Sequence, residues 1–252
     1  MSALTQAAVS KSVVQPEAGA SLRPIHVLLG IQSLVVILVS INRLSSLTQT
    51  YVAANEFLRW QDLINMLPLP LISGVAFWLL LRLLEQRASI AARGRLTLNI
   101  VFIAGLYLLA ASYGTHEVTN YLHVRFCPPE ESSRLCEIIA FNDDDFSHWV
   151  FFAGFVLMNV ALLLMQVIAP HPQQLSRRDV LLLILNGLFI GLGVFANLAF
   201  EEIGLDLYVV ALLAVLALGL LWRVGRQPLV IYYVTAYGVG LVGTALYKWV
   251  VL

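Results

Sequence analysis

The stretch SHWVFFAGFVLMNVALLLMQVIA, residues 147–169, decides the fold class of this chain. It contains no Asp, Glu, Lys or Arg, and about 20 helical residues are enough to cross a hydrocarbon core about 30 Å thick. Six similar runs occur at about 25–42, 63–84, 96–115, 179–200, 205–222 and 228–250. With 60% hydrophobic and 12% charged residues, the sequence predicts an all-α integral membrane protein, a bundle of seven transmembrane helices.

The remaining segments give the expected domain organisation. Residues 1–23 are polar and rich in Ser and Ala, and we expect a disordered cytoplasmic tail there. Residues 24–252 are expected to form a single seven-helix membrane domain, with an external loop at about 118–146. The apolar stretch after Arg23 is too long for a cleavable signal peptide, so we expect the first helix to remain in the protein.

The charges are strongly segregated although the net charge is zero. If the N-terminus is cytoplasmic, the tail and every second loop are cytoplasmic too. Those segments carry ten of the 15 basic residues, namely Lys11, Arg23, Arg82, Arg87, Arg93, Arg95, Arg177, Arg178, Arg223 and Arg226. The opposite side then carries twelve of the 15 acidic residues. Because short basic loops stay in the cytoplasm, we expect an N-in, C-out protein of the cell membrane, in a bacterial cytoplasmic membrane.

The two cysteines lie together in the predicted external loop. Cys127 and Cys136 bound the segment CPPEESSRLC. Cysteines that face an oxidising compartment usually pair, so we expect a disulfide between them. Two free thiols or a pair of metal ligands are the alternatives, and the second is disfavoured because the chain has no further cysteine to complete a thiolate site.

Three of the five histidines fall at predicted outer helix ends. On the third helix, His116, Asn120 and His123 are spaced to share one face, and Glu117 lies beside that face. The third histidine, His148, opens the fourth helix. Ionisable groups next to a bilayer are costly unless they serve a site, a pathway or a solvated loop. These helix ends are therefore the predicted functional region.

Three aspartates precede the fourth helix in the segment Asp143-Asp144-Asp145-Phe-Ser-His148. Asp144 and Asp145 lie four and three residues before His148, so either carboxylate can meet the imidazole on one helix face. Such a carboxylate would orient the histidine or share a metal ion with it. Aspartates at a helix start also cap the helix and complement its dipole, and this simpler role stays open.

Polar residues also mark the inside and the outer end of later helices. The predicted fifth helix closes with Glu201 and Glu202, and Asn197 shares a face with Glu201. We expect Asn197, Asn120 and Asn159 to line a polar cavity. Alternatively, each forms one hydrogen bond between helices, worth about 1 kcal/mol.

Three histidines with nearby carboxylates match a catalytic zinc site, which uses three protein ligands and leaves one position for water. The expected ligands of a Zn²⁺ ion come from His116, His148, His123, Asp145 and Glu117. Glu201 or Glu202 would then be the general base. The favoured function is a metal-dependent hydrolase that acts on a lipid or lipid-linked substrate.

Two other classes of function stay open. One is a transporter, receptor or assembly factor that binds a cation or a partner at an acidic outer mouth. The other is a structural subunit whose acidic residues are only solvated. Nucleic-acid binding has no support because the basic residues are spread over short loops. Membrane lipid is the one partner that the sequence predicts, and it indicates no particular protein partner.

Seven membrane helices with histidines and an aspartate near one face resemble the ceramidase and adiponectin-receptor type of membrane zinc hydrolase. That type has paired histidines on its last helix, whereas residues 228–252 contain none. The segment Asp145-Phe-Ser-His148 also resembles the opening of a helix in VanZ-like and YjdF-like bacterial membrane proteins. No residue role is carried over from either resemblance.

Overall fold

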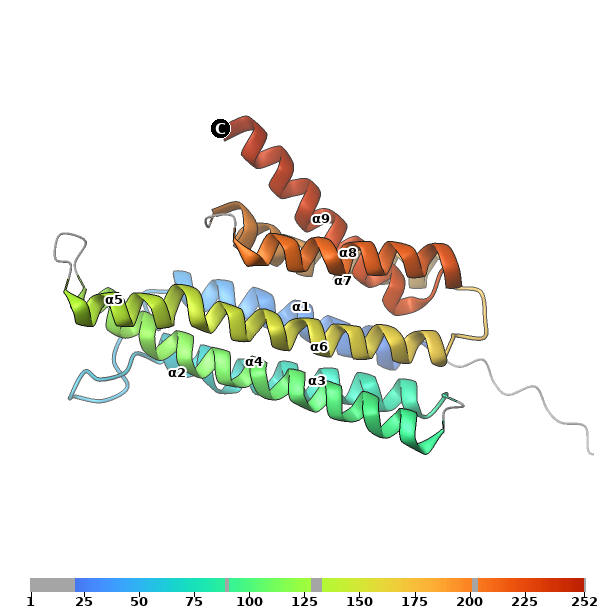
Figure 1. Cartoon of the computed structure of the whole chain (residues 1–252), viewed down its shortest axis with the longest axis horizontal. Helices are drawn as coiled ribbons and strands as arrows, with labels where there is room; N and C mark the ends of the chain where they lie inside the picture. Colours follow the sequence, from blue (N-terminus) through green and yellow to red (C-terminus); the bar gives the residue numbers. More distant parts are fainter. Residues whose placement is uncertain (1–20, 89–90, 128–132, 201–203, 252) are drawn as a thin grey trace, which may run out of the picture.

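The computed structural model describes residues 21–88, 91–127, 133–200 and 204–251, and apart from one isolated β-bridge their regular structure is helical (Figure 1). The elements are α1 (Arg23–Leu44), α2 (Trp60–Met66), α3 (Pro68–Glu85), α4 (Ala92–Phe126), α5 (Arg134–Ala140), the π-helical segment η1 (Phe141–Phe146), α6 (Ser147–Ile168), α7 (Arg177–Phe200), α8 (Leu205–Val224) and α9 (Pro228–Val251).

Within the described ranges, seven helical segments are long and apolar enough to cross a membrane. Helices α2 and α3 together form one of them, and α5, η1 and α6 together form another. The predicted all-α class is therefore confirmed, and so is the prediction of seven helices long and apolar enough to cross a membrane. The N-in orientation stays a prediction, and most of the predicted tail, residues 1–20, lies outside the described residues.

Most of the segment predicted as an external loop, residues 118–146, is helical, and its external position stays a prediction. Helix α4 continues to Phe126, and α5 and η1 fill residues 134–146. At 1.5 Å per residue, the 35 residues of α4 extend about 52 Å, well beyond a hydrocarbon core about 30 Å thick. The polar residues after position 115 end the apolar run but not the helix, so the sequence pattern did not mark the end of α4.

A disulfide closes the end of this long helical hairpin. The Sγ atoms of Cys127 and Cys136 lie at disulfide distance, as predicted, and the bond joins the end of α4 to α5. Arg125 packs over the rings of Tyr51 and Tyr121, which holds the loop between α1 and α2 against α4. The projecting part of the hairpin is thus fixed from two sides.

Helices α4 and α6 are packed backbone to backbone. A Cβ atom at Gly105 would lie 2.8 Å from the carbonyl oxygen of Gly154, and one at Gly154 would lie 2.6 Å from the carbonyl oxygen of Gly105. Only glycine permits this approach, which is common between membrane helices. Further along, Ser112 Oγ donates to the carbonyl oxygen of Ser147 at 2.8 Å. These contacts fix the rotation of α4 relative to α6.

Helix α2 is short because Pro68 begins α3. A proline lacks the N–H that a continuous helix would need, and it is well suited to a first helical turn. The break leaves α2 as a separate element whose Asp62 and Asn65 are fully buried. Asn42 of α1 donates from Nδ2 to Asn65 Oδ1 at 2.8 Å, so α2 is attached to the end of α1.

Helices α1 and α7 run parallel and in register. His26 Nε2 lies 2.9 Å from Asp179 Oδ1. Seven residues further along both helices, Ser33 Oγ donates to Asn186 Oδ1 at 2.8 Å. The bundle has two ends (Figure 1). We call them the basic end and the acidic end, after the charged residues that predominate at each. At the basic end α1 begins, α3 ends and α4 begins. At the acidic end α1 and α4 end and α5 begins.

Candidate metal centre

Asp143 is the centre of a polar cluster at the acidic end. It lies in η1 and is 1% exposed. π-Helical turns, in which the i→i−5 hydrogen bond replaces the i→i−4 bond, are rare overall. Where they occur, they are frequently found at functional sites. Here Ser147 Oγ donates to the carbonyl oxygen of Asp143, and Ser112 of α4 binds the carbonyl oxygen of Ser147. These hydroxyls hold η1 against α4.

Four side chains of α4 surround the Asp143 carboxylate. His116 Nδ1 lies 3.0 Å from Oδ1, and His123 Nδ1 lies 3.2 Å from Oδ2. Thr119 Oγ1 donates to Oδ1 at 3.3 Å, and Asn120 Nδ2 donates to Oδ2 at 3.4 Å. The helix face that the spacing of His116, Asn120 and His123 predicted is the face that meets Asp143.

His123, Asp143 and Asp144 offer ligand atoms that all lie within 4.8 Å of one another. His123 Nδ1 is 3.2 Å from Asp143 Oδ2 and 3.9 Å from Asp144 Oδ2. Tetrahedral zinc with bonds of roughly 2.0–2.2 Å separates its ligand atoms by about 3.4 Å. The group therefore has the dimensions of a metal site. The Asp144 side chain is 64% exposed, so an ion can enter from that side.

A second buried carboxylate, Glu117, lies on the other side of His116. Arg43 of α1 donates from Nη2 to Glu117 Oε1 at 3.0 Å, and Asn65 of α2 donates from Nδ2 to Oε2 at 3.4 Å. Asn42 holds Asn65 in turn. Three helices thus meet at Glu117, which is why this acidic residue can be buried.

His116 connects the two carboxylates. Its Nε2 lies 3.4 Å from Arg43 Nη2, and its Nδ1 lies 3.0 Å from Asp143 Oδ1. A guanidinium can only donate, so this arrangement fits a lone pair on Nε2 and a proton on Nδ1. In either protonation state, the Nδ1 atom of His116 can donate to Asp143 and orient its carboxylate.

The buried groups carry an excess of negative charge. Arg43 is the guanidinium that contacts Glu117, and among the described residues no further Lys or Arg forms an ion pair with Asp143. With neutral histidines, one negative charge remains, and the exposed Asp144 adds a second. A buried charge without a partner is costly. A proton on one of the histidines that contact Asp143, or a bound cation, would balance this charge.

The structure places the other predicted ligands near this centre but in different surroundings. The rings of His116 and His148 lie side by side, with centroids 5.4 Å apart. Asp145 is exposed and outside the group of neighbouring ligand atoms. Asp143 takes the position next to the histidines because the helix begins earlier than the sequence indicated and passes through a π-helical turn.

The predicted cavity residues have separate partners. Asn120 contacts Asp143, whereas Asn159 donates to the carbonyl oxygen of Phe155 at 2.7 Å. Asn197 lies in the last turn of α7. Glu201 and Glu202, the predicted general bases, lie outside the described residues.

Sequence reasoning did not identify Arg43, Asn42 and Asn65 as members of the cluster. The sequence did offer one indication for Arg43, because it is one of the few basic residues on the predominantly acidic side. Its contact with Glu117 joins residues 74 positions apart. Helical spacing relates residues within one helix and gives no information on such a contact.

No protein-family model, curated protein or solved structure matches this chain. The class that the fold and the cluster define is an all-helical protein with seven segments able to cross a membrane and a buried aspartate flanked by two histidines.

Proposed function

We propose that this chain is a multi-pass membrane protein that binds a divalent metal ion, preferably Zn²⁺, through His123, Asp143 and Asp144. The observation that carries the proposal is the excess negative charge around Asp143 beside an imidazole nitrogen. A divalent ion would neutralise that charge. It would also find nitrogen and carboxylate ligands at suitable separations, which are donors that zinc accepts.

The surroundings of Asp143 support the same assignment. Both of its oxygens are held, one by His116 and Thr119 and the other beside His123 and Asn120. Metal-binding carboxylates are commonly oriented by such hydrogen bonds, which fix the ligand before the ion arrives. His116 would act as a positioning residue for Asp143.

The chemistry we infer for this metal is hydrolysis. Three protein ligands leave a position for water, whose pKa a zinc ion lowers toward about 7. The apolar part of α4 ends near residue 115, which supports a position of His116 and His123 at and beyond the edge of the hydrocarbon core. That is the level of lipid headgroups, and a lipid or lipid-linked ester or amide is the proposed substrate. Glu201 or Glu202 remains the proposed general base.

Cation transport is the second candidate, and polar pairs along α1 favour it. His26 with Asp179, Ser33 with Asn186 and Arg43 with Glu117 follow the helix from one end to the other. Chains of such residues mark proton or ion pathways in membrane proteins. We place transport second because the stretch of α1 between Ser33 and Asn42 is almost entirely apolar over about 13 Å.

The test is a zinc titration of the purified full chain after chelator treatment. We expect one Zn²⁺ per chain in the wild type and none in His123→Ala, while His148→Ala keeps the ion. Loss of zinc in His148→Ala alone would overturn the proposed ligand set. Zinc-dependent cleavage of lipid esters in vesicles then supports the hydrolase, whereas zinc entry into sealed proteoliposomes without cleavage supports the transporter.

We also infer that the N-terminus is cytoplasmic and the acidic end external, in a bacterial cytoplasmic membrane. The charge distribution supports this orientation, because the basic end carries most of the Lys and Arg residues. A reporter enzyme that is active only outside the cytoplasm, fused after the C-terminus, is expected to be active. Activity of a cytoplasm-specific reporter at the same position would contradict it.

A further inference from the structure

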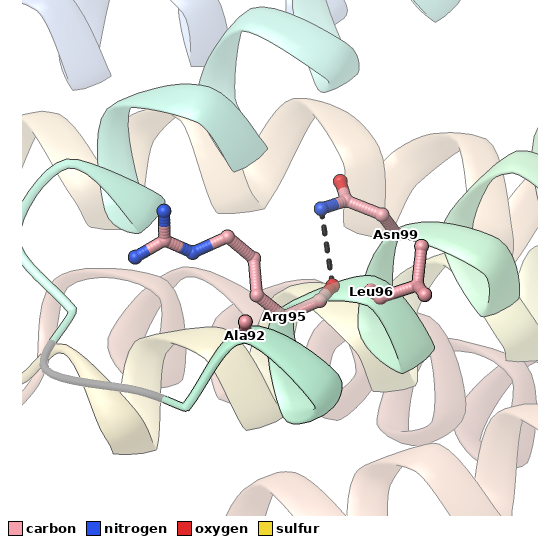
Figure 2. A pocket seen from close by; sticks show the side chains of 4 residues that line it. All are labelled: Ala92, Arg95, Leu96 and Asn99. Carbon is pink, nitrogen blue, oxygen red and sulfur yellow. Dashed lines mark hydrogen bonds between the residues drawn. The ribbon is translucent and has the colours of Figure 1, made fainter.

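A pocket of about 330 Å³ lies at the basic end, where α4 begins (Figure 2). It is lined by Ala92, Arg95, Leu96 and Asn99. Asn99 Nδ2 donates to the carbonyl oxygen of Arg95 at 3.0 Å, and Figure 2 shows the Arg95 guanidinium extended away from that amide. The pocket is far from the proposed metal centre, at the opposite end of α4.

The exposed charge around this pocket is positive. Glu85 is the one acidic residue between positions 82 and 95, and it is buried and held by Arg82 and Asn99. Arg93 and Arg95 are exposed. Among the described residues the Arg95 guanidinium has no hydrogen-bond partner and no ion pair. Its donors are therefore available to an anion.

A strip of exposed apolar side chains leads from the pocket along α4. Leu96, Ile100, Ile103 and Tyr107 are 61%, 57%, 58% and 71% exposed. Their spacing of four, three and four residues places them on one helix face. At 1.5 Å per residue the strip is about 16 Å long, close to half of a hydrocarbon core about 30 Å thick. It therefore has the length of one membrane leaflet.

We propose that an anionic phospholipid binds here, with its phosphate on Arg95 in the pocket and one acyl chain along the strip from Leu96 to Tyr107. Guanidinium groups match phosphate oxygens with paired hydrogen bonds, and basic residues next to the end of a membrane helix attract anionic headgroups. The positive guanidinium would contact the negatively charged headgroup, and the apolar strip next to it would contact the acyl chain. This site is independent of the metal centre.

The experiment is native mass spectrometry of the full chain released from mixed micelles that contain equal amounts of phosphatidylglycerol and phosphatidylcholine. We expect one phosphatidylglycerol to stay bound preferentially. Arg95→Gln is expected to lower its occupancy about fivefold, since one basic group near a headgroup contributes about 1 kcal/mol. Arg93→Gln is the matched control, because Arg93 is exposed nearby but does not line the pocket, and it should retain the lipid.

Three outcomes would overturn the proposal. Equal retention of the two lipids by the wild type would show that the headgroup charge is not recognised. An equal effect of the Arg95 and Arg93 substitutions would indicate a diffuse basic surface. Inorganic phosphate that displaces the lipid at equal concentration would identify a phosphate site, because the strip would then contribute nothing. Leu96→Ser, which leaves the guanidinium in place, is expected to weaken lipid binding but not phosphate binding.

Discussion

Glu117 and Arg43 form an ion pair of 3.0 Å in which one partner is buried and the other reaches solvent: the Glu117 side chain is 2% exposed and the Arg43 side chain 43% exposed. The pair joins α1 to α4 and lies next to His116. Its asymmetry means that the two partners do not contribute equally to stability. The buried carboxylate depends on the guanidinium, whereas the guanidinium can be hydrated in its absence.

The first prediction concerns this pair. Arg43→Ala leaves Glu117 buried without its counter-charge and is expected to lower the free energy of unfolding by about 3–5 kcal/mol. Glu117→Gln leaves Arg43 free to turn to water and should cost only about 1 kcal/mol. Unfolding of both variants in mixed micelles measures the difference. The variant that carries both substitutions should be more stable than Arg43→Ala. If it is less stable, the unpaired Glu117 carboxylate is not what destabilises Arg43→Ala.

The second prediction separates a metal ligand from a positioning residue. His116→Ala removes the imidazole that holds Asp143 Oδ1, and the loss of such a partner weakens metal binding by about 10–100-fold. His123→Ala removes the proposed ligand itself and is expected to abolish binding. Zinc affinities measured by competition with a chelating dye decide the matter, and equal losses in the two variants would contradict the assigned roles.

The third prediction concerns the disulfide. Cys127 and Cys136 are nine positions apart, and closing a loop of that size contributes about 2–3 kcal/mol. We expect Cys127→Ser with Cys136→Ser to lower stability by this amount and to weaken zinc binding, because the end of α4 is then less firmly held to the helix that carries Asp143. Treatment of the wild type with a reductant should reproduce both effects. Unchanged zinc affinity would show that the hairpin end does not support the site.

The fourth prediction is a pH effect at the basic end. Burial, with Arg87 nearby, lowers the pKa of His171, so the folded chain binds a proton there less readily than the unfolded chain. The stability contribution is fully present above the unfolded value of about 6.5, and it is lost as the pH falls below that value and through the lower pKa of the folded chain. Unfolding measured at pH 8 and pH 5.5 should show a smaller difference for His171→Asn than for the wild type. An identical difference would contradict the assignment.

The fold was predictable because the membrane imposes it locally. The length and composition of each apolar run were enough to predict the seven helices able to cross a membrane, without knowledge of how they pack. The ends of α4 and α5 were not predictable in this way, because helices continue into water without an apolar run. The glycine contact of Gly105 with Gly154 was also missed, since nothing in either run pairs it with the other.

The candidate site was predictable where it depends on one helix. The spacing of His116, Asn120 and His123 gave the face that meets Asp143. The sequence did not predict that Asp143 is the aspartate that meets the histidines, because the π-helical turn changes the register between Asp143 and His148. Arg43 joins the cluster through the packing of α1 on α4, which one sequence does not reveal.

The measurement that tests the central claim most directly is zinc stoichiometry in a pair of neighbouring variants. Asp143→Asn changes the buried carboxylate between the two histidines, and Asp145→Asn changes an exposed carboxylate two residues away. Elemental analysis of the purified chains should find one zinc per chain in the wild type and in Asp145→Asn, and none in Asp143→Asn. Zinc that is absent from the wild type, or equally present in both variants, would contradict a metal centre at Asp143.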